Sequence, residues 1–194
     1  EQSPEESKST GVDWEAIALE PEEFVSNAHC ALERFDNLKY ELIRRGVESR
    51  IIPNKIGWHR GYFVFPFFDY AGELSGIVFR ATPSVQKKTK TRYVIASGQE
   101  LQLYCPDWMR VESSRYVFRV YGIFDALTLA ALDYPVVTSS EGKKFRSEWF
   151  NVPIFRKKII DLPDRGEEIF ARLNVSELGW RGRLGLLNYP EKCK

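Results

Sequence analysis

The sequence predicts a mixed α/β protein, in which an α+β N-terminal subdomain precedes an α/β subdomain with a four-stranded parallel sheet. In the first half, aromatic and β-branched runs follow each other across short polar turns, which is typical of antiparallel hairpins. In the second half, such runs alternate with helical apolar spacing, which is typical of parallel strands joined by crossover helices. The pattern changes near residue 112. We therefore expect a flexible tail or linker at 1–19 and subdomains at 20–112 and 113–194.

Composition excludes several classes of protein. The 194 residues are 43% hydrophobic, enough for a substantial core, and the net charge of +1 indicates that only local clusters could attract a polyanion. The cysteines show no C-x-x-C spacing, so we expect neither zinc in this chain nor a disulfide framework, and the setting is intracellular, that is, cytoplasmic. They are Cys30, Cys105 and Cys193. No apolar run approaches the roughly 20 residues that span a bilayer. Because the first residue is Glu1, we expect a piece of a longer protein.

The first half begins with a polar segment and a helical region. Residues 1–19 carry many acidic and Ser residues without apolar periodicity, which predicts a flexible segment. Helical spacing then runs from Pro21 to Gly46, and Asp36-Asn37 can divide it into two helices.

Extended segments follow the helical region. Residues 61–69 and 73–81 read as the two strands of a hairpin around a turn at 69–72. A third strand is expected at 92–96 and a short extended piece at 101–106.

A basic segment lies between the second and third strands. Residues 84–91 predict a mobile loop that carries Lys87, Lys88 and Lys90, with Arg80 and Arg92 on the strands beside it. Two interpretations remain open: a solvated surface, or contact with a phosphate backbone by cations on adjacent strands.

The second half alternates strands and helices. Strands are expected at 115–120, 134–138, 156–162 and 182–187, and helices at 123–132, 143–150 and 167–178. Two turns, at 120–126 and 160–167, each place an Asp at the point where a parallel strand ends and a helix follows. Ligands bind at that edge of open α/β sheets, so we expect the functional site there.

The order of these pieces resembles the RNA-polymerase core of bacterial-type DNA primases. Residues 64–72 (VFPFFDYAG) and 76–80 (GIVFR) resemble the family's FPIRD..GRVIGFGGR stretch, and residues 92–97 (RYVIAS) fall where it has KYLNSP. Residues 120–129 resemble the VEGYFDALAL turn of the TOPRIM fold, and 188–194 (NYPEKCK) look like its LPEGCKD segment. The resemblance covers about residues 21–194 and rests on the order and spacing of the motifs.

The resemblance implies primer synthesis, a nucleotidyl transfer that uses Mg²⁺ or Mn²⁺ held by carboxylates. The family's turn glutamate falls on Tyr121, which departs from the pattern, while its aspartate matches Asp125. The first aspartate of the D-x-D pair falls on Asp164 or, in a second register, on Asp161, and in both the second aspartate is absent. A phenol stays neutral at pH 7, so we expect one metal position to be badly weakened.

The candidate site residues follow from these matches. Asp125 and Asp164 are the catalytic candidates, and the metal candidates are Asp125, Asp164, Glu167 and Asp161. An Asp at a helix start is also a common N-cap, so a purely structural role for Asp125 and Asp164 remains open. The nucleic-acid-binding candidates are Arg80, Arg92, Lys87, Lys88, Lys90, Lys143 and Lys144.

The resemblance leaves two functions open. One is a primase-like TOPRIM core of a DNA replication protein, which binds a single-stranded DNA template and synthesises primers from nucleoside triphosphates. The other is a catalytically degenerate TOPRIM module kept for nucleic-acid binding or protein docking, which Tyr121 and the broken D-x-D pair favour. A TOPRIM nuclease would need the same missing carboxylates. The family also implies a replicative helicase, separate or fused, as a partner.

Overall fold

The computed structural model describes residues 14–90, 93–95, 103–140 and 146–185. Most of the expected tail and the motif at 188–194 lie outside these ranges. The described part contains helices and two sheets, so the predicted α/β class is confirmed. The subdomain boundaries stay a prediction.

The first sheet has the order β1-β2-β3-β4, and all its neighbouring strands are antiparallel. The predicted hairpin is confirmed as β2 (Tyr62–Phe68) and β3 (Leu74–Ala81), and the predicted third strand as β4 (Tyr93–Ile95). The sequence did not predict β1 (Gly57–His59), which pairs with the start of β2.

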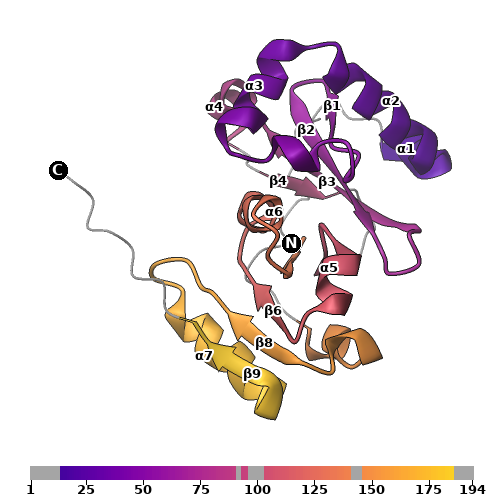
Figure 1. Cartoon of the computed structure of the whole chain (residues 1–194). Coiled ribbons are helices and arrows are strands. Elements are labelled where there is room, and N and C mark those ends of the chain that lie inside the picture. Colours follow the sequence, from indigo (N-terminus) through magenta and orange to yellow (C-terminus); the bar gives the residue numbers. More distant parts are fainter. Residues whose placement is uncertain (1–13, 91–92, 96–102, 141–145, 186–194) are drawn as a thin grey trace, which may run out of the picture.

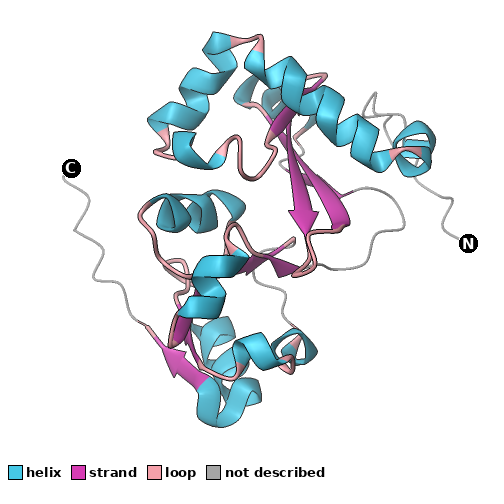
Figure 2. Cartoon of the chain, turned by 45° about the vertical axis from the view of Figure 1, so that its right-hand side comes forward, coloured by secondary structure: helices cyan, strands magenta, loops and turns pink. Residues whose placement is uncertain are grey.

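Helices lie above this sheet in the views of Figures 1 and 2. The expected division at Asp36-Asn37 is confirmed, because α2 (Pro21–Glu33) and α3 (Asp36–Arg44) are separate helices, followed by a short 3₁₀ turn, η1 (Glu48–Arg50). Both sheet faces are buried, and alternate β2 residues enter different cores: Phe63 and Phe65 in one, Val64 in the other.

Two segments that were expected to be flexible are helical. Residues 14–19 form α1 (Trp14–Leu19), because Ile17 is buried in the core that contains Val64. The basic segment forms α4 (Pro83–Thr89) rather than a loop. Pro83 at its first turn presets the helical φ angle, and Val85 packs against the same core, which anchors a segment otherwise made of polar residues.

The second sheet has the order β5-β7-β6-β8-β9. Its four predicted parallel strands are confirmed as β6 (Tyr116–Arg119), β7 (Val136–Ser139), β8 (Lys158–Asp161) and β9 (Gly182–Leu184). The expected extended piece is β5 (Leu103–Tyr104), which adds an antiparallel edge.

The helices of the second half follow the predicted alternation, with two differences. The structure confirms α6 (Ile123–Ala131) and α7 (Glu168–Leu178), and it adds α5 (Trp108–Ser113), which the sequence did not predict. The helix expected at 143–150 is described only as the 3₁₀ turn η2 (Ser147–Phe150), and two further 3₁₀ turns are η3 (Pro153–Phe155) and η4 (Gly179–Arg181).

One hydrophobic core joins the two sheets, and α6 lies between them (Figure 1). Phe65 of β2 meets Phe124 of α6 edge to face, with ring centroids 5.4 Å apart. Because both sheets bury side chains in this core, the turn before α6 is held against the first sheet. None of the helices in the described ranges is long and apolar enough to cross a membrane.

The close approach of β1 to α2 gives a first test of this packing. A Cβ at Gly57 would lie 2.7 Å from the backbone carbon of Ala28, closer than packed atoms can approach. We expect Gly57→Ala to destabilise the fold by about 1–3 kcal/mol through overpacking. Denaturant unfolding measures this, with Ser26→Ala on the exposed side of α2 as control. Equal midpoints for the two variants would contradict this packing.

Candidate functional site at the carboxyl edge of the parallel sheet

The turn after β6 carries the first group of candidate residues. Tyr121 is buried, and Gly122 is the N-cap of α6. The Asp125 carboxylate folds back over Gly122 so closely that a Cβ there would collide with its Oδ2 atom, yet the residue is exposed. Asp125 lies in the first turn of α6, where its negative charge interacts favourably with the positive end of the helix dipole.

The neighbouring strand end carries a buried ion pair. Arg119, the last residue of β6, is the register partner of Asp161, the last residue of β8. The Arg119 Nη1 atom lies 3.0 Å from each oxygen of the Asp161 carboxylate, and the two side chains are 1% and 0% exposed. A buried carboxylate is tolerated only when it is paired and hydrogen-bonded, and Arg119 supplies the pairing.

Two more side chains complete this arrangement, which we call the Arg119 network: Arg119, Tyr121, Asp161 and Asn174. The Tyr121 hydroxyl donates to Asp161 Oδ2 at 3.3 Å. The Asn174 amide of α7 donates to the same oxygen at 3.2 Å and to the Tyr121 hydroxyl at 3.1 Å. The Tyr121 ring also lies against the Arg119 guanidinium, 4.6 Å from its carbon, so each member contacts at least two others.

Burial governs protonation in the Arg119 network. It raises the pKa of Tyr121 to about 12, and the Asp161 charge acts in the same direction. Burial also raises the pKa of the Asp161 carboxyl, against the opposing effects of Arg119 and the hydrogen-bond donors. Tyr121 is therefore a neutral donor at pH 7, and the positive charge facing the carboxylate comes from Arg119.

These residues do not fit a divalent cation. Mg²⁺ requires several oxygen ligands with free lone pairs, whereas Asp161 faces a guanidinium and two neutral donors. In the part of the chain that the structure describes, no three His, Cys, Asp or Glu side chains are grouped so that they could hold a metal ion.

The remaining acidic candidates lie in the segment between β8 and α7. Asp164 is exposed, and its backbone carbonyl accepts a hydrogen bond from the Glu167 amide at 2.9 Å, which makes a turn. Glu167 is the N-cap residue of α7 without a side-chain capping bond. Asp125, Asp161, Asp164 and Glu167 are thus all described but do not form one carboxylate cluster.

Basic side chains gather on the other side of the turn. Arg80 lies on the face of β3 that turns toward α6, and its guanidinium carbon is 4.3 Å from the centre of the Phe124 ring. The Arg45 guanidinium, at the end of α3, is 4.4 Å from the same ring centre. Arg80 also donates to the Tyr93 hydroxyl at 2.7 Å. Phe124 therefore holds two cations from separate elements beside Asp125.

The other basic candidates are partly described. Lys87, Lys88 and Lys90 are exposed on α4 and at its left-handed C-cap. Arg92, Lys143 and Lys144 lie outside the described residues.

Sequence reasoning missed three residues of this edge. Arg45, Arg119 and Asn174 are not among the site residues that the sequence predicts. Arg119 alone left a signal, because it is a charged residue in the otherwise apolar and aromatic run Tyr116–Arg119.

Comparisons with known proteins give the class of fold. No family model matches the sequence, and no curated protein is significantly similar to it. Solved structures do match. The Aquifex aeolicus primase (zinc-binding and RNA polymerase domains) superimposes with a TM-score of 0.71 at 14% identity, over 93% of this chain and 57% of that one. A DnaG primase catalytic domain bound to single-stranded DNA gives 0.68 at 15% identity, over 91% and 74%.

A third match is the primase fragment of the bacteriophage T7 primase-helicase protein, with a TM-score of 0.57 at 17% identity over 73% of this chain and 61% of that one. The chain therefore has the fold of bacterial-type primase catalytic cores, as its motifs predicted. It spans less than two thirds of the Aquifex and T7 chains.

The Arg119 network predicts a large penalty for removing its cation. Arg119→Met leaves the Asp161 charge buried and unpaired, so we expect a loss of about 3–5 kcal/mol in the free energy of unfolding. Arg119→Met with Asp161→Leu should recover most of it, because no charge then remains buried.

The matched control is Arg44→Met, which breaks an exposed pair with Glu41 and should cost about 1 kcal/mol or less. Urea unfolding monitored by circular dichroism gives all three values. Similar losses for Arg119→Met and Arg44→Met would contradict the structural role of the buried pair.

Proposed function

We propose that the chain is a primase-type core that binds single-stranded DNA at the junction between its two sheets. The observation that carries the proposal is the convergence of Arg45 and Arg80 on the Phe124 ring, beside the turn that follows β6. Phe124 is itself buried, so its ring holds the two guanidinium groups side by side and does not stack on bases. The proposed contacts are therefore those of cations along a phosphate backbone, which supply much of the affinity of a single-strand path. The likeness to a primase domain bound to single-stranded DNA supports the same ligand.

The proposed path continues onto α4. Lys87, Lys88 and Lys90 extend the positive charge from Arg80, because α4 follows β3 directly and packs against it. Arg92, Lys143 and Lys144 complete the proposed set. Such contacts are with phosphates, so they give affinity without reading the base sequence.

Primer synthesis is the second candidate function. It would use Asp125 and Asp164, with Asp161 and Glu167 as further ligands of Mg²⁺ or Mn²⁺ and nucleoside triphosphates as substrates. The Arg119 network argues against it, since Asp161 already has a cation and Tyr121 brings a neutral phenol. We therefore propose that this TOPRIM-like edge is catalytically degenerate and that template binding is the retained activity.

In a longer protein, a template-binding core of this kind would act beside the machinery that unwinds the duplex. The T7 match is a fragment of a primase-helicase protein, which supports a replicative helicase, separate or fused, as the proposed protein partner.

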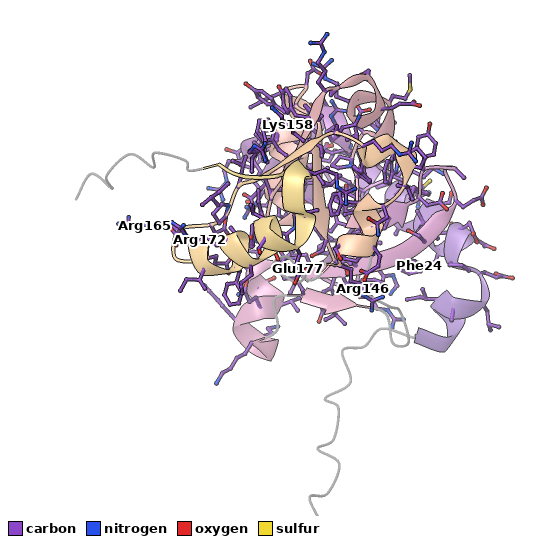
Figure 3. All side chains as sticks on the ribbon, turned by 90° about the horizontal axis from the view of Figure 1, so that it is seen from below. Phe24, Arg146, Lys158, Arg165, Arg172 and Glu177 are labelled. Atoms are coloured by element: carbon purple, nitrogen blue, oxygen red, sulfur yellow. The ribbon has the colours of Figure 1, made fainter. Side chains whose placement is uncertain are left out.

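Template binding is tested with a fluorescent oligonucleotide and a salt titration. Arg80→Ala with Arg92→Ala should weaken binding by about tenfold and lower the salt slope by about 0.7 for each phosphate contact removed. Arg172→Ala is the control, because Arg172 lies on the exposed side of α7, at the end of the molecule away from α4 (Figures 1 and 3). An unchanged affinity in the double variant would remove the proposed path.

Primer synthesis is tested by incorporation of labelled nucleotides on a single-stranded template with Mg²⁺ or Mn²⁺. We expect no incorporation by the wild type while template binding persists, because the carboxylates needed for a metal do not converge. Incorporation that Asp125→Ala abolishes would contradict the degenerate assignment and restore primer synthesis as the function.

A further inference from the structure

The Arg119 network lies where the primase resemblance assigns a metal ligand at Tyr121 and, in one register, another at Asp161. We propose that the Arg119 guanidinium is a built-in replacement for the divalent cation of this sheet edge, so that the edge is complete without Mg²⁺ or Mn²⁺. This inference rests on the proposed degeneracy of the edge and gives its cause, the charge inside the sheet; it does not concern the DNA on the surface.

The first support is the set of hydrogen-bond donors that the Asp161 carboxylate already accepts. A carboxylate offers about four lone-pair sites to donors. Arg119 Nη1 contacts both oxygens of Asp161, and Oδ2 also accepts from the Tyr121 hydroxyl and the Asn174 amide. A metal ion could coordinate Oδ2 only by displacing donors from Arg119, Tyr121 and Asn174, and it could coordinate Oδ1 only by competing with the Arg119 guanidinium.

The second support is the charge inside the site. The Arg119 side chain is 1% exposed, and its guanidinium directly contacts the only carboxylate of the network. A divalent ion bound to Asp161 would lie within a few ångströms of that guanidinium, in a buried region where water screens little. Arg119 therefore satisfies the carboxylate and at the same time repels a competing cation.

The third support is the match between Tyr121 and Arg119. The Tyr121 ring lies 4.6 Å from the guanidinium carbon, and its hydroxyl reaches the carboxylate that the guanidinium binds. A glutamate at this position would offer no ring to the cation and would add a second negative charge next to Asp161. The phenol that departs from the family's pattern thus gives the internal guanidinium an aromatic contact and adds no second negative charge.

Asn174 of α7 provides an NMR probe of the network. Its side-chain amide donates to both Tyr121 and Asp161, so a metal ion bound at Asp161 would lie close to it. Asn54 provides a matched control elsewhere in the molecule, because it is also buried and its side-chain oxygen accepts a hydrogen bond from the Tyr104 hydroxyl.

The experiment uses this pair of amides in the full chain without DNA. Paramagnetic Mn²⁺ broadens NMR signals near the site where it binds. In the wild type, added Mn²⁺ should leave the Asn174 side-chain amide signals as sharp as those of Asn54. Selective broadening of Asn174 would overturn the proposal, because it would mean that the edge holds a metal ion despite Arg119.

A second variant tests whether Arg119 is the cause. Arg119→Met with Tyr121→Glu removes the cation and brings two carboxylates to the edge. Mn²⁺ should then broaden Asn174 selectively and raise the unfolding temperature, because a ligand that binds only the folded state stabilises it by RT ln(1 + c/Kd), where c is the concentration of free Mn²⁺. A folded double variant that shows neither effect would contradict the proposed role of Arg119. If the variant does not fold, the wild-type measurement decides alone.

Binding of Mn²⁺ and binding of DNA are separate readouts. Loss of the proposed DNA path would leave sharp Asn174 signals unaffected, and selective broadening of Asn174 would leave the DNA measurement unaffected. The failure of this inference is thus distinguishable from the failure of the proposed DNA binding.

Discussion

The buried ion pair between Arg119 and Asp161 is the constraint around which the carboxyl edge of the parallel sheet is arranged, because neither charge can be left buried without the other. The two residues end adjacent parallel strands in direct register, so their pairing lies across the β6–β8 ladder. The desolvation of two buried charges is costly, and it is offset only when every remaining donor and acceptor is matched. Tyr121 and Asn174 add hydrogen bonds to Oδ2 of Asp161 and tie the turn before α6 and helix α7 to the same carboxylate.

Helix α6 connects this edge of the parallel sheet to the first sheet. The turn that carries Tyr121 leads directly into α6, whose Phe124 packs against Phe65 and receives the guanidinium groups of Arg45 and Arg80. The order of the edge and the placement of the basic side chains are therefore coupled through one ring.

The fold and the chemistry of this edge are separable. A primase-core fold persists at 14–17% identity to the solved structures because it rests on apolar patterning that many sequences satisfy. The chemistry rests on a few positions at strand ends. Here a phenol, at Tyr121, stands where the resemblance assigns a metal-binding carboxylate, and the Arg119 guanidinium pairs with Asp161 beside it. The parallel sheet accommodates both, because its ladder is made of backbone hydrogen bonds.

The sequence by itself determined the order of the elements: the hairpin of β2 and β3, the division between α2 and α3, and the parallel strands from β6 to β9. Local periodicity and turn residues decide these features. Tertiary structure alone decided that residues 14–19 and 83–89 are helical, because single apolar anchors, Ile17 and Val85, reach a core built from other segments. It also decided the partner of Arg119, since Asp161 lies 42 residues away and only the register of β6 against β8 brings them together. The register between two strands that are far apart in the sequence cannot be predicted from local residue patterns. At this edge, that register decides that Asp161 pairs with Arg119 and is not free to bind a metal ion.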